Sequence, residues 1–481
     1  MLTAPPYVPA VTRVQAARPE RRSARPRLVP ALVAGAVFLV YTAYALREHQ
    51  RFGTTGYDLG IFGQAVRAYA DLRAPDSAIR TATAPPGFSG DAYPLLGDHF
   101  HPILALLAPL YASAPHVETL LVAQAALVAI STYVVAKAAG RHLGNPWAAF
   151  SVGLAYGFSW GLQELVAFDF HEVAFAVPLL ALSCAAYLDG RWVAAAWWAA
   201  GLLLVKEDLG ATAAVLGLLL FRHHRRAGLA LCVGSLAATG LITLVAIPAL
   251  APDGRYGYLH QSHAYGVLDG WSVKAQFLLA LLAVTAGLAL RSPLALLLLP
   301  TLVWRLTSPN PAYWDTALHY SAVLMPIAFG ALVDALRKGM RLPVVVPLAV
   351  MALMFPAKPL GALGEAGFWQ PGTRETAARV AVEHVPDGVT VAASNSLAPH
   401  LTDRTRTYLA VRRVLREQPD ISWLVVDARD PFPAGEAIAA ARMVEADGWI
   451  RVHAGDGLAV YRRPAEQPAD RPEEGAGRPV R

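Results

Sequence analysis

A polar segment, Gly53–Pro102, opens with Gly56-Tyr57-Asp58-Leu59-Gly60-Ile61-Phe62 and closes with Gly97-Asp98-His99-Phe100-His101-Pro102. It separates the first long apolar run of the chain from the next one. Polar residues that interrupt apolar runs mark the places where a chain leaves a hydrocarbon phase. The other polar clusters between apolar runs are therefore expected to open on the same side as this segment.

The composition is typical of a membrane protein. Of the 481 residues, 55% are hydrophobic and 16% are charged, whereas soluble domains are about 25% charged. Apolar runs of roughly 14 to 24 residues recur, which is enough to cross or nearly cross a hydrocarbon core of about 30 Å. The net charge of +6 could suggest a nucleic-acid partner. However, the basic residues stand at the ends of apolar runs and form no patch with interleaved aromatics. The sequence predicts an α-helical polytopic membrane protein whose partners are membrane lipids and not nucleic acid.

About eleven transmembrane helices are predicted within residues 28–357. The expected spans are Leu28–Leu46, His116–Ala139, Pro146–Gln163, Val173–Leu188, Trp192–Val205, Leu209–Phe221, Gly228–Leu250, Val273–Leu290, Pro293–Leu306, Tyr320–Leu336 and Leu342–Phe355. A large first outer loop is expected at 48–102, followed by a short half-buried helix at Ile103–Tyr111.

Basic residues give these spans a direction. The N-terminal residues 1–27, rich in Arg and Pro, predict a disordered basic arm. On the side of this arm lie Lys137 and Arg141; Arg191; Arg222, Arg225 and Arg226; Arg291; and Arg337, Lys338 and Arg341. The positive-inside rule therefore predicts a plasma-membrane protein with a cytoplasmic N-terminus. Signal-peptidase cleavage after Ala43-Tyr44-Ala45 is an open alternative that leaves the first loop outside.

The long apolar runs end before Lys358, and residues 358–463 predict a small soluble α/β domain. The expected elements are strands at Val389–Ala393 and Ile421–Asp427, helices at Thr373–His384 and Ala434–Ala446, and a hairpin of Trp449–His453 with Gly457–Arg462. An odd number of spans places this domain outside the cell. Residues 464–481 predict a disordered tail.

Five clusters of polar residues fall on the side of the first loop. They are Tyr57 and Asp58; Asp98, His99 and His101; Asp169, His171 and Glu172; Lys206, Glu207 and Asp208; and Trp314 and Asp315 with His319 and Tyr320. Any one cluster is equally consistent with an ordinary solvated loop. Lys206–Asp208 differs because it joins two short apolar arms and is expected to dip below the membrane surface. An unpaired charge there costs about 2.5 kcal/mol or more and is normally kept for function.

Taken together, the clusters predict a cavity for a ligand with a phosphate head and a neutral polar body, such as a lipid-phosphate sugar. Lys206 can neutralise a phosphate, and a carboxylate can act as a general base. A divalent cation, Mg or Mn, is a possible cofactor, with Asp58, Asp169 and Glu172 as candidate ligands. The spacing of Asp98-His99-Phe100-His101 is no recognised metal signature. Zinc there is a minor alternative, and neutral hydrogen-bonded histidines are another.

These motifs resemble those of the DUF2079 family of predicted membrane proteins. The resemblance rests on Tyr57–Gln64, Gly97–Pro102, Asp169–Glu172, Val205–Asp208, and Ser394–Leu401 followed by Arg404, and it spans residues 35–462. Gly63 departs from the family, in which many relatives carry an acid or its amide, so no ligand role is expected there. In layout the family is similar to the GT-C glycosyltransferases, multi-span enzymes that use polyprenyl-phosphate-linked sugars.

The resemblance implies an inverting GT-C glycosyltransferase that transfers a sugar from a polyprenyl-phosphate donor to an unknown acceptor on the outer face. It implies that Asp58 is the general base, with Asp169 as the alternative, and that Lys206 neutralises the departing phosphate. Asp169, His171 and Glu172 would position the sugar or a metal. The remaining residues expected to bind substrate are Tyr57, Asp98, His99, His101, Glu207, Asp208, His319 and Tyr320.

Two other functions stay open. A transporter or flippase of a lipid-linked or polar solute should carry charges at mid-membrane depth together with internal repeats. A non-catalytic membrane scaffold should tolerate Asp58→Asn. The segment Ser394–Arg404 either contributes acceptor-binding groups or forms only a strand-to-loop turn.

Overall fold

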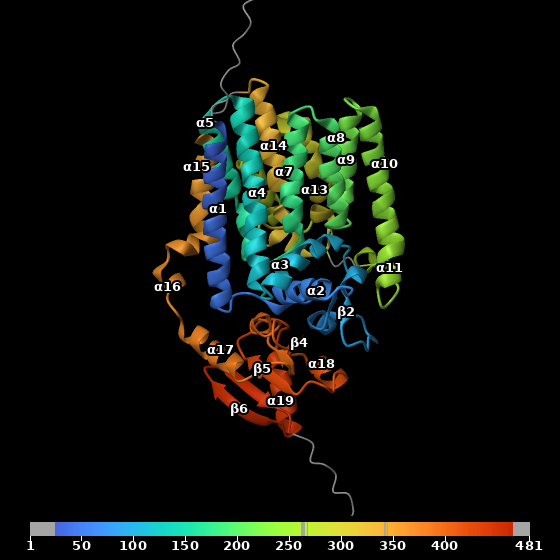
Figure 1. Ribbon diagram of the computed structural model, residues 1–481, viewed down its shortest axis with the longest axis vertical. Helices are drawn as coiled ribbons and strands as arrows, with labels where there is room; N and C mark the ends of the chain where they lie inside the picture. Colours follow the sequence, from blue (N-terminus) through green and yellow to red (C-terminus); the bar gives the residue numbers. More distant parts are fainter. Residues whose placement is uncertain (1–24, 261–264, 267, 341–342, 344, 465–481) are drawn as a thin grey trace, which may run out of the picture.

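The computed structural model describes residues 25–464 except 261–264, 267, 341–342 and 344. Residues 1–24 of the predicted arm and 465–481 of the predicted tail lie outside this range. Within it, the structure is mostly helical, with a small sheet near the C-terminus (Figure 1). The first helix begins at Arg25, three residues before the predicted start of the first span. The helix of the first apolar run extends back through them.

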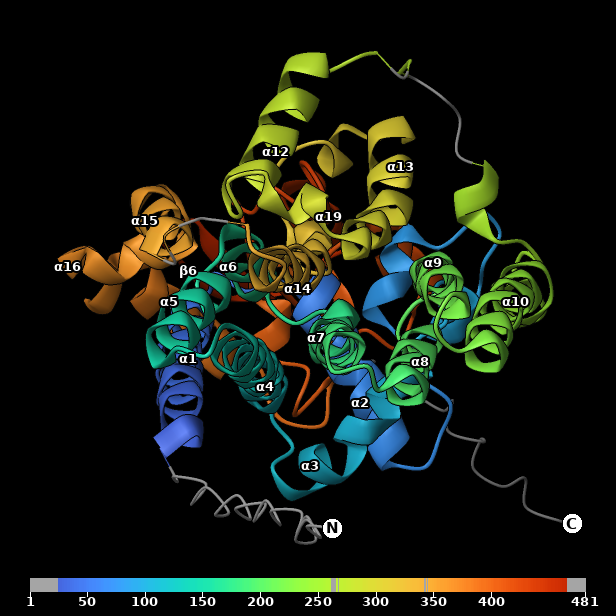
Figure 2. The same cartoon turned by 90° about the horizontal axis from the view of Figure 1, so that it is seen from above.

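Most of the apolar helices stand side by side (Figure 1). They are α1 (Arg25–Gln50), α4 (Glu118–Leu143), α5 (Pro146–Gly157), α7 (Ala176–Leu188), α8 (Trp192–Ala200), α9 (Leu209–Phe221), α10 (Arg225–Leu241), α12 (Trp271–Ala283), α13 (Leu299–Thr307), α14 (Leu324–Arg337) and α15 (Val345–Met354). Seen from above, α14 lies near the middle of the group and α10 at its rim (Figure 2). Burial agrees with this arrangement, because α14 is largely buried and α10 is mostly exposed.

The prediction of about eleven transmembrane helices is wrong. Over the described part of the chain, four helices are long and apolar enough to cross a membrane: Leu28–Gln50, Glu118–Leu143, Arg225–Leu250 and His319–Arg337. The other apolar runs form helices of 10–17 residues: Pro102–Ser113, Glu172–Leu188, Trp192–Leu204, Leu209–Phe221, Trp271–Ala283, Pro293–Thr307 and Val345–Ala357. A crossing needs about 20 residues, so these helices are too short to cross by length alone.

A polar turn divides one of the predicted spans. The predicted span Pro146–Gln163 is divided between α5 and α6 (Trp160–Ala167), because Ser159 adopts an extended backbone. The side chain of Gln163 donates to the carbonyl of Phe158 at 2.8 Å and so satisfies a backbone group that the break leaves without a helical partner. A hydrophobicity count does not detect such a break.

The first polar segment is a folded layer and not an open loop. Its main helix, α2 (Ile61–Ala70), lies across the lower ends of the upright helices in Figure 1. Two short strands, β1 (Asp76–Ser77) and β2 (Tyr93–Pro94), pair antiparallel beside it. Gln64 of α2 accepts hydrogen bonds from the Ser77 hydroxyl at 2.6 Å and from the amide of Ile79 at 3.2 Å. The short helix predicted at Ile103–Tyr111 is confirmed, since helical structure extends from Pro102 through α3 (Ala108–Ser113).

A five-stranded sheet in the order β4-β3-β5-β7-β6 lies below this layer (Figure 1). Its strands are β3 (Thr390–Ala393), β4 (Arg406–Leu409), β5 (Trp423–Asp427), β6 (Ile450–Gly455) and β7 (Leu458–Arg462), and its helices are α17 (Thr373–Glu383), α18 (Arg412–Glu417) and α19 (Glu436–Ala446). Strand β3 is parallel to β4 and β5, and β7 is antiparallel to β5 and β6. The predicted strands, helices and terminal hairpin are confirmed, whereas β4 and α18 were not predicted.

A buried arginine ties this C-terminal α/β region to the first helix. Arg47 of α1 donates to the carbonyls of Phe368, at the end of α16 (Ala366–Trp369), and of Gln370. It also forms an ion pair with Glu375 of α17 at 2.9 Å, with both side chains less than 10% exposed. A buried ion pair of this kind fixes geometry, since removing one partner leaves an uncompensated charge.

Candidate functional site

The turns between the helices and the folded first segment enclose a cavity of about 560 Å³. Twelve of the thirteen predicted site residues line it: Tyr57, Asp58, Asp98, His99, His101, His171, Glu172, Lys206, Glu207, Asp208, His319 and Tyr320. The remaining one, Asp169, does not. A volume of several hundred Å³ is typical of small-molecule sites. Segments that lie far apart in the sequence thus place their polar residues around one space.

Asp58 lies in the turn Gly56–Gly60, which leads directly into α2. Behind it, the hydroxyl of Thr55 lies 2.8 Å from Asp169 Oδ2 and 3.4 Å from Asp58 Oδ2, and the Thr55 amide donates to Asp169 at 2.7 Å. Burial raises the pKa of Asp58 to about 7. Burial and the nearby Asp58 carboxyl raise the pKa of Asp169 to about 8. Of this carboxyl pair, Asp58 faces the cavity and Asp169 supports it from behind.

The backbone at Asp169 is held in an unusual conformation. Its φ of 61° lies in the left-handed region, which is costly for a residue other than glycine. The side chain of Gln124, on α4, donates to the carbonyl of Asp169 and accepts from the amide of His171 at 3.0 Å. This clamp turns the chain so that Asp169 points toward Thr55 while His171 and Glu172 point into the cavity.

Lys206 and Glu172 form an ion pair in the cavity wall. Lys206 Nζ lies 3.0 Å from Glu172 Oε1, and His171 Nδ1 lies 2.6 Å from Glu172 Oε2. The ring of His171 stacks on that of His319 with centroids 3.5 Å apart. Burial disfavours the charged lysine, but Glu172 and the neighbouring Asp208 and Glu207 outweigh burial and hold the pKa of Lys206 well above its usual value. The ammonium group is therefore charged at neutral pH.

Glu207 joins three segments. Its carboxylate lies 2.6 Å from His99 Nδ1, accepts from the amide of Phe100 at 3.0 Å, and accepts from the hydroxyl of Tyr256 at 2.7 Å. Although burial opposes ionisation, His99 and the other partners lower the pKa of Glu207 to about 2. The carboxylate is thus ionised, and its hydrogen bonds hold the three segments together as a structural brace.

Asp98 is occupied in a similar way. Its two oxygens accept from Arg80 at 2.9 and 3.2 Å. Burial would raise the pKa of Asp98, but His99 and Arg80 hold it below its usual value. The pair leaves neither charge free for a ligand without a change of partner.

Asp208 differs from these braced acids. Burial raises its pKa to about 6, and over the described part of the chain its Oδ1 atom has no hydrogen-bond partner. Burial lowers the pKa of His101 to about 4, so this imidazole is neutral at pH 7. Asp58 and Asp208 are therefore the cavity carboxyl groups that can gain or lose a proton near neutral pH.

Several residues of the site were not predicted from the sequence. They are Thr55, Arg80, Phe168, Tyr256, Tyr258, Trp304 and Tyr313. Tyr258 stacks on His99 with ring centroids 4.5 Å apart, and Tyr313 meets Tyr320 edge to face at 4.7 Å. One feature of the sequence could have indicated the aromatic ones: aromatic residues are frequent in the polar segments between the apolar runs. Aromatic side chains supply flat apolar surfaces in ligand sites.

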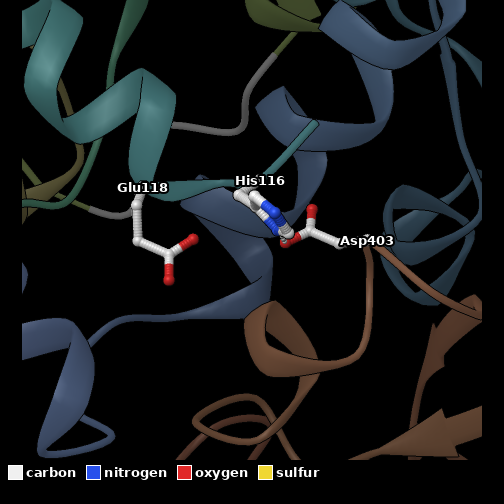
Figure 3. Close-up of side chains that lie close together, drawn as sticks. All are labelled: His116, Glu118 and Asp403. Atoms are coloured by element: carbon white, nitrogen blue, oxygen red, sulfur yellow. Dashed lines mark ion pairs between the residues drawn. The ribbon is translucent and has the colours of Figure 1, made fainter. Parts of the chain in front are cut away.

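A separate group of possible metal ligands lies outside the cavity. The donor atoms of His116, Glu118 and Asp403 lie within 4.8 Å of one another, where the start of α4 meets the C-terminal region (Figure 3). His116 Nδ1 and Asp403 Oδ2 are 3.7 Å apart, so an ordinary ion pair also accounts for the contact. Among the described residues, Asp58, Asp169 and Glu172 form no such group. A divalent cation in the cavity therefore stays a prediction.

The comparison with protein families gives a match over most of the chain. The family described as "Predicted membrane protein (DUF2079)" matches residues 48–460. This match confirms the resemblance inferred from the motifs. The comparison with curated proteins gives no match.

Proposed function

The chain belongs to the DUF2079 family of predicted membrane proteins, and we propose that it is a GT-C-like glycosyltransferase of the plasma membrane. It transfers a sugar from a polyprenyl-phosphate donor to an acceptor hydroxyl on the outer face. One observation carries this proposal: a single cavity holds a carboxyl group with a pKa near 7, Asp58, and a charged lysine, Lys206. A general base and a cation for a leaving phosphate are what such a transfer needs.

In this mechanism Asp58 removes the proton from the acceptor hydroxyl. The acceptor oxygen forms a bond to the anomeric carbon from the side opposite the phosphate, and the bond from that carbon to the phosphate oxygen breaks. The configuration at the anomeric carbon is therefore inverted. The lipid phosphate leaves with the electron pair and needs little protonation, while Lys206 stabilises its charge. Asp169 and Thr55 hold Asp58 from behind.

The other cavity residues suit the body of a sugar. Asp208 lines the cavity with a carboxyl group that can accept from a sugar hydroxyl, and Tyr57 and Tyr320 offer phenolic groups. Trp304 and Tyr313 add aromatic surface against which a pyranose ring can lie. Asp98, His99 and Glu207 shape the wall through their mutual bonds. A divalent cation would supply further charge stabilisation to the phosphate.

Orientation follows the same proposal. A cytoplasmic N-terminus, as the basic residues predict, would place the far end of α1 outside the cell. The cavity lies at that end, and Arg47 ties the C-terminal α/β region to it, so both would lie outside. Polyprenyl lipids would then reach the cavity from the outer leaflet. The competing function, a transporter or flippase, needs a path that opens alternately to both sides.

The test is turnover of a panel of radiolabelled polyprenyl-phosphate sugars by the purified full chain in detergent. We expect Asp58→Asn to lose on the order of 10²-fold or more in rate while it keeps donor binding. The matched control is Asp71→Asn, an exposed acid at the end of α2 in the same layer. Absence of binding and turnover for every donor, in protein that is folded and monodisperse, would refute a transferase. Solute uptake by proteoliposomes would then support transport.

A further inference from the structure

The loop that follows β3 contains a buried asparagine with a defined conformation. Asn395 is 6% exposed. Its neighbours are fixed within the C-terminal region: the Ser394 hydroxyl accepts from the amide of Asp427 at 2.9 Å, and Ser396 donates its amide and hydroxyl to Asp430 at 2.7 and 2.9 Å. This loop lies at the carboxyl end of a parallel strand, the side on which open α/β sheets bind their ligands.

The loop after β3 is hydrogen-bonded to the turn Gly56–Gly60, which carries Asp58. The amide of Tyr57 donates to Asn395 Oδ1 at 2.8 Å, and the amide of Gly56 donates to the Asn395 carbonyl at 2.7 Å. The approach is close, because a Cβ atom added to Gly56 would lie 2.7 Å from the Cβ of Ala398. Real Cβ contacts essentially never occur at that distance, so the turn requires glycine at position 56.

The turn is thus held from two sides. On the membrane side, Thr55 is fixed to Asp169. On the C-terminal side, Asn395 accepts the amide of the residue directly before Asp58. Removing the Asn395 acceptor would leave the Tyr57 amide without its partner, and backbone amides away from water are almost always paired. The turn would then shift to find another acceptor, and Asp58 would move with it.

We propose that Asn395 is a positioning residue that sets the orientation of Asp58, so that the C-terminal α/β region forms part of the catalytic site. This inference rests on the proposed transferase function. It also assigns a physical role to the segment that begins at Ser394, because its first residues dock on the Asp58 turn. A soluble region that only recruits a partner would have no need of this contact.

The experiment uses the purified full chain and three variants. Asn395→Leu removes the side-chain acceptor at similar size, and Asn395→Asp keeps an acceptor oxygen but adds a negative charge. Thr376→Ala, at an exposed position of α17 in the same α/β region, is the control. Hydrogen exchange, read by mass spectrometry on peptides covering residues 54–60, needs no substrate. Turnover and its pH dependence are then measured with the polyprenyl-phosphate sugar that the wild type uses.

For Asn395→Leu we expect amide exchange in residues 54–60 to rise roughly tenfold, as the loss of one buried hydrogen bond predicts. We also expect kcat to fall with KM unchanged. Asn395→Asp should keep most of the protection and move the acidic limb of the pH profile to higher pH, because added negative charge disfavours ionisation of Asp58. Thr376→Ala should alter none of these quantities.

Two results would overturn the inference. One is unchanged exchange at residues 54–60 in Asn395→Leu. The other is an exchange increase with wild-type kcat and an unshifted pH profile in both Asn395 variants, which would make the contact structural alone. A third outcome concerns the proposed function: exchange rises in Asn395→Leu, but the wild-type protein transfers no sugar. That outcome would refute the transferase and, with it, a catalytic role for the contact. The failure of each proposal is therefore recognisable separately.

Discussion

Two buried lysines of this chain provide a matched comparison. Lys206 pairs with Glu172 at 3.0 Å, and Lys358 pairs with Glu164 at 2.9 Å. The lysine side chains are 15% and 14% exposed, so the two ammonium groups are about equally accessible to solvent. Only the first pair lines the cavity of the described structure. If Lys206 stabilises a departing phosphate, Lys206→Ala must impair catalysis in a way that Lys358→Ala does not.

The two losses can be estimated separately. Removing one partner of a buried ion pair costs about 3–5 kcal/mol of stability. We expect Lys206→Ala to approach this range because Glu172 is 1% exposed, and Lys358→Ala to cost less because Glu164 is 14% exposed. Loss of one preorganised group that stabilises transition-state charge typically lowers kcat about 10²–10³-fold. That catalytic loss is expected for Lys206→Ala only.

The assay is sugar transfer in detergent at a temperature below the unfolding midpoint of both variants, with rates expressed per folded molecule. Lys206→Arg serves as a second variant that keeps the charge but changes its geometry, and it should recover part of the lost rate. Wild-type turnover by Lys206→Ala would refute the assigned role. Equal losses in Lys206→Ala and Lys358→Ala would show that ion-pair loss, and not phosphate stabilisation, explains the effect.

The pH dependence tests Asp58. A base must be ionised, so kcat/KM should rise with pH through about 7, where burial places the pKa of Asp58. A rise centred near pH 4, the usual value for aspartate, would argue for another base. A second prediction concerns Glu207, whose folded pKa of about 2 lies below its unfolded value. Its stabilising contribution is present above pH 4.3 or so and is lost as the pH falls toward 2. Glu207→Gln should therefore lower the thermal unfolding midpoint at pH 7 by more than at pH 3, and an equal decrease at both would contradict the assigned brace.

The positions of the helices follow from the sequence because burial of apolar surface dictates them. The run predicted at His116–Ala139 is α4, Glu118–Leu143, and the run at Leu209–Phe221 is α9 with the same ends. The division of the run Pro146–Gln163 does not follow, because it depends on Gln163 satisfying a broken backbone. Such a hydrogen bond joins groups whose proximity exists only in the folded chain.

The polar clusters that line the cavity follow from the sequence, whereas its aromatic lining and the roles of its acids do not. Each polar interruption of an apolar run marks a helix end, and helix ends on one side of a membrane protein meet at one level. The difference between a braced acid and a free one depends on partners from distant segments. Glu207 is braced by His99 and Tyr256, and Asp169 is turned toward Thr55 by Gln124. No local pattern identifies these partners.

The charge balance of the cavity limits how an anionic ligand can enter. Among the described residues, the lining lysine and arginine are Lys206 and Arg80, and each already holds a carboxylate, Glu172 and Asp98. A phosphate that approaches Lys206 must therefore either displace Glu172 or bring a cation of its own. If Lys206 turns toward the phosphate, Glu172 loses its cationic partner. His171, 2.6 Å from Glu172, can then bind a proton and take the place of that cation. Without a metal, donor binding should then take up a proton and weaken as the pH rises, whereas with a bound divalent cation it should depend on that cation. Isothermal titration calorimetry of donor binding in buffers of different ionisation enthalpy, with and without a chelator, separates these two routes.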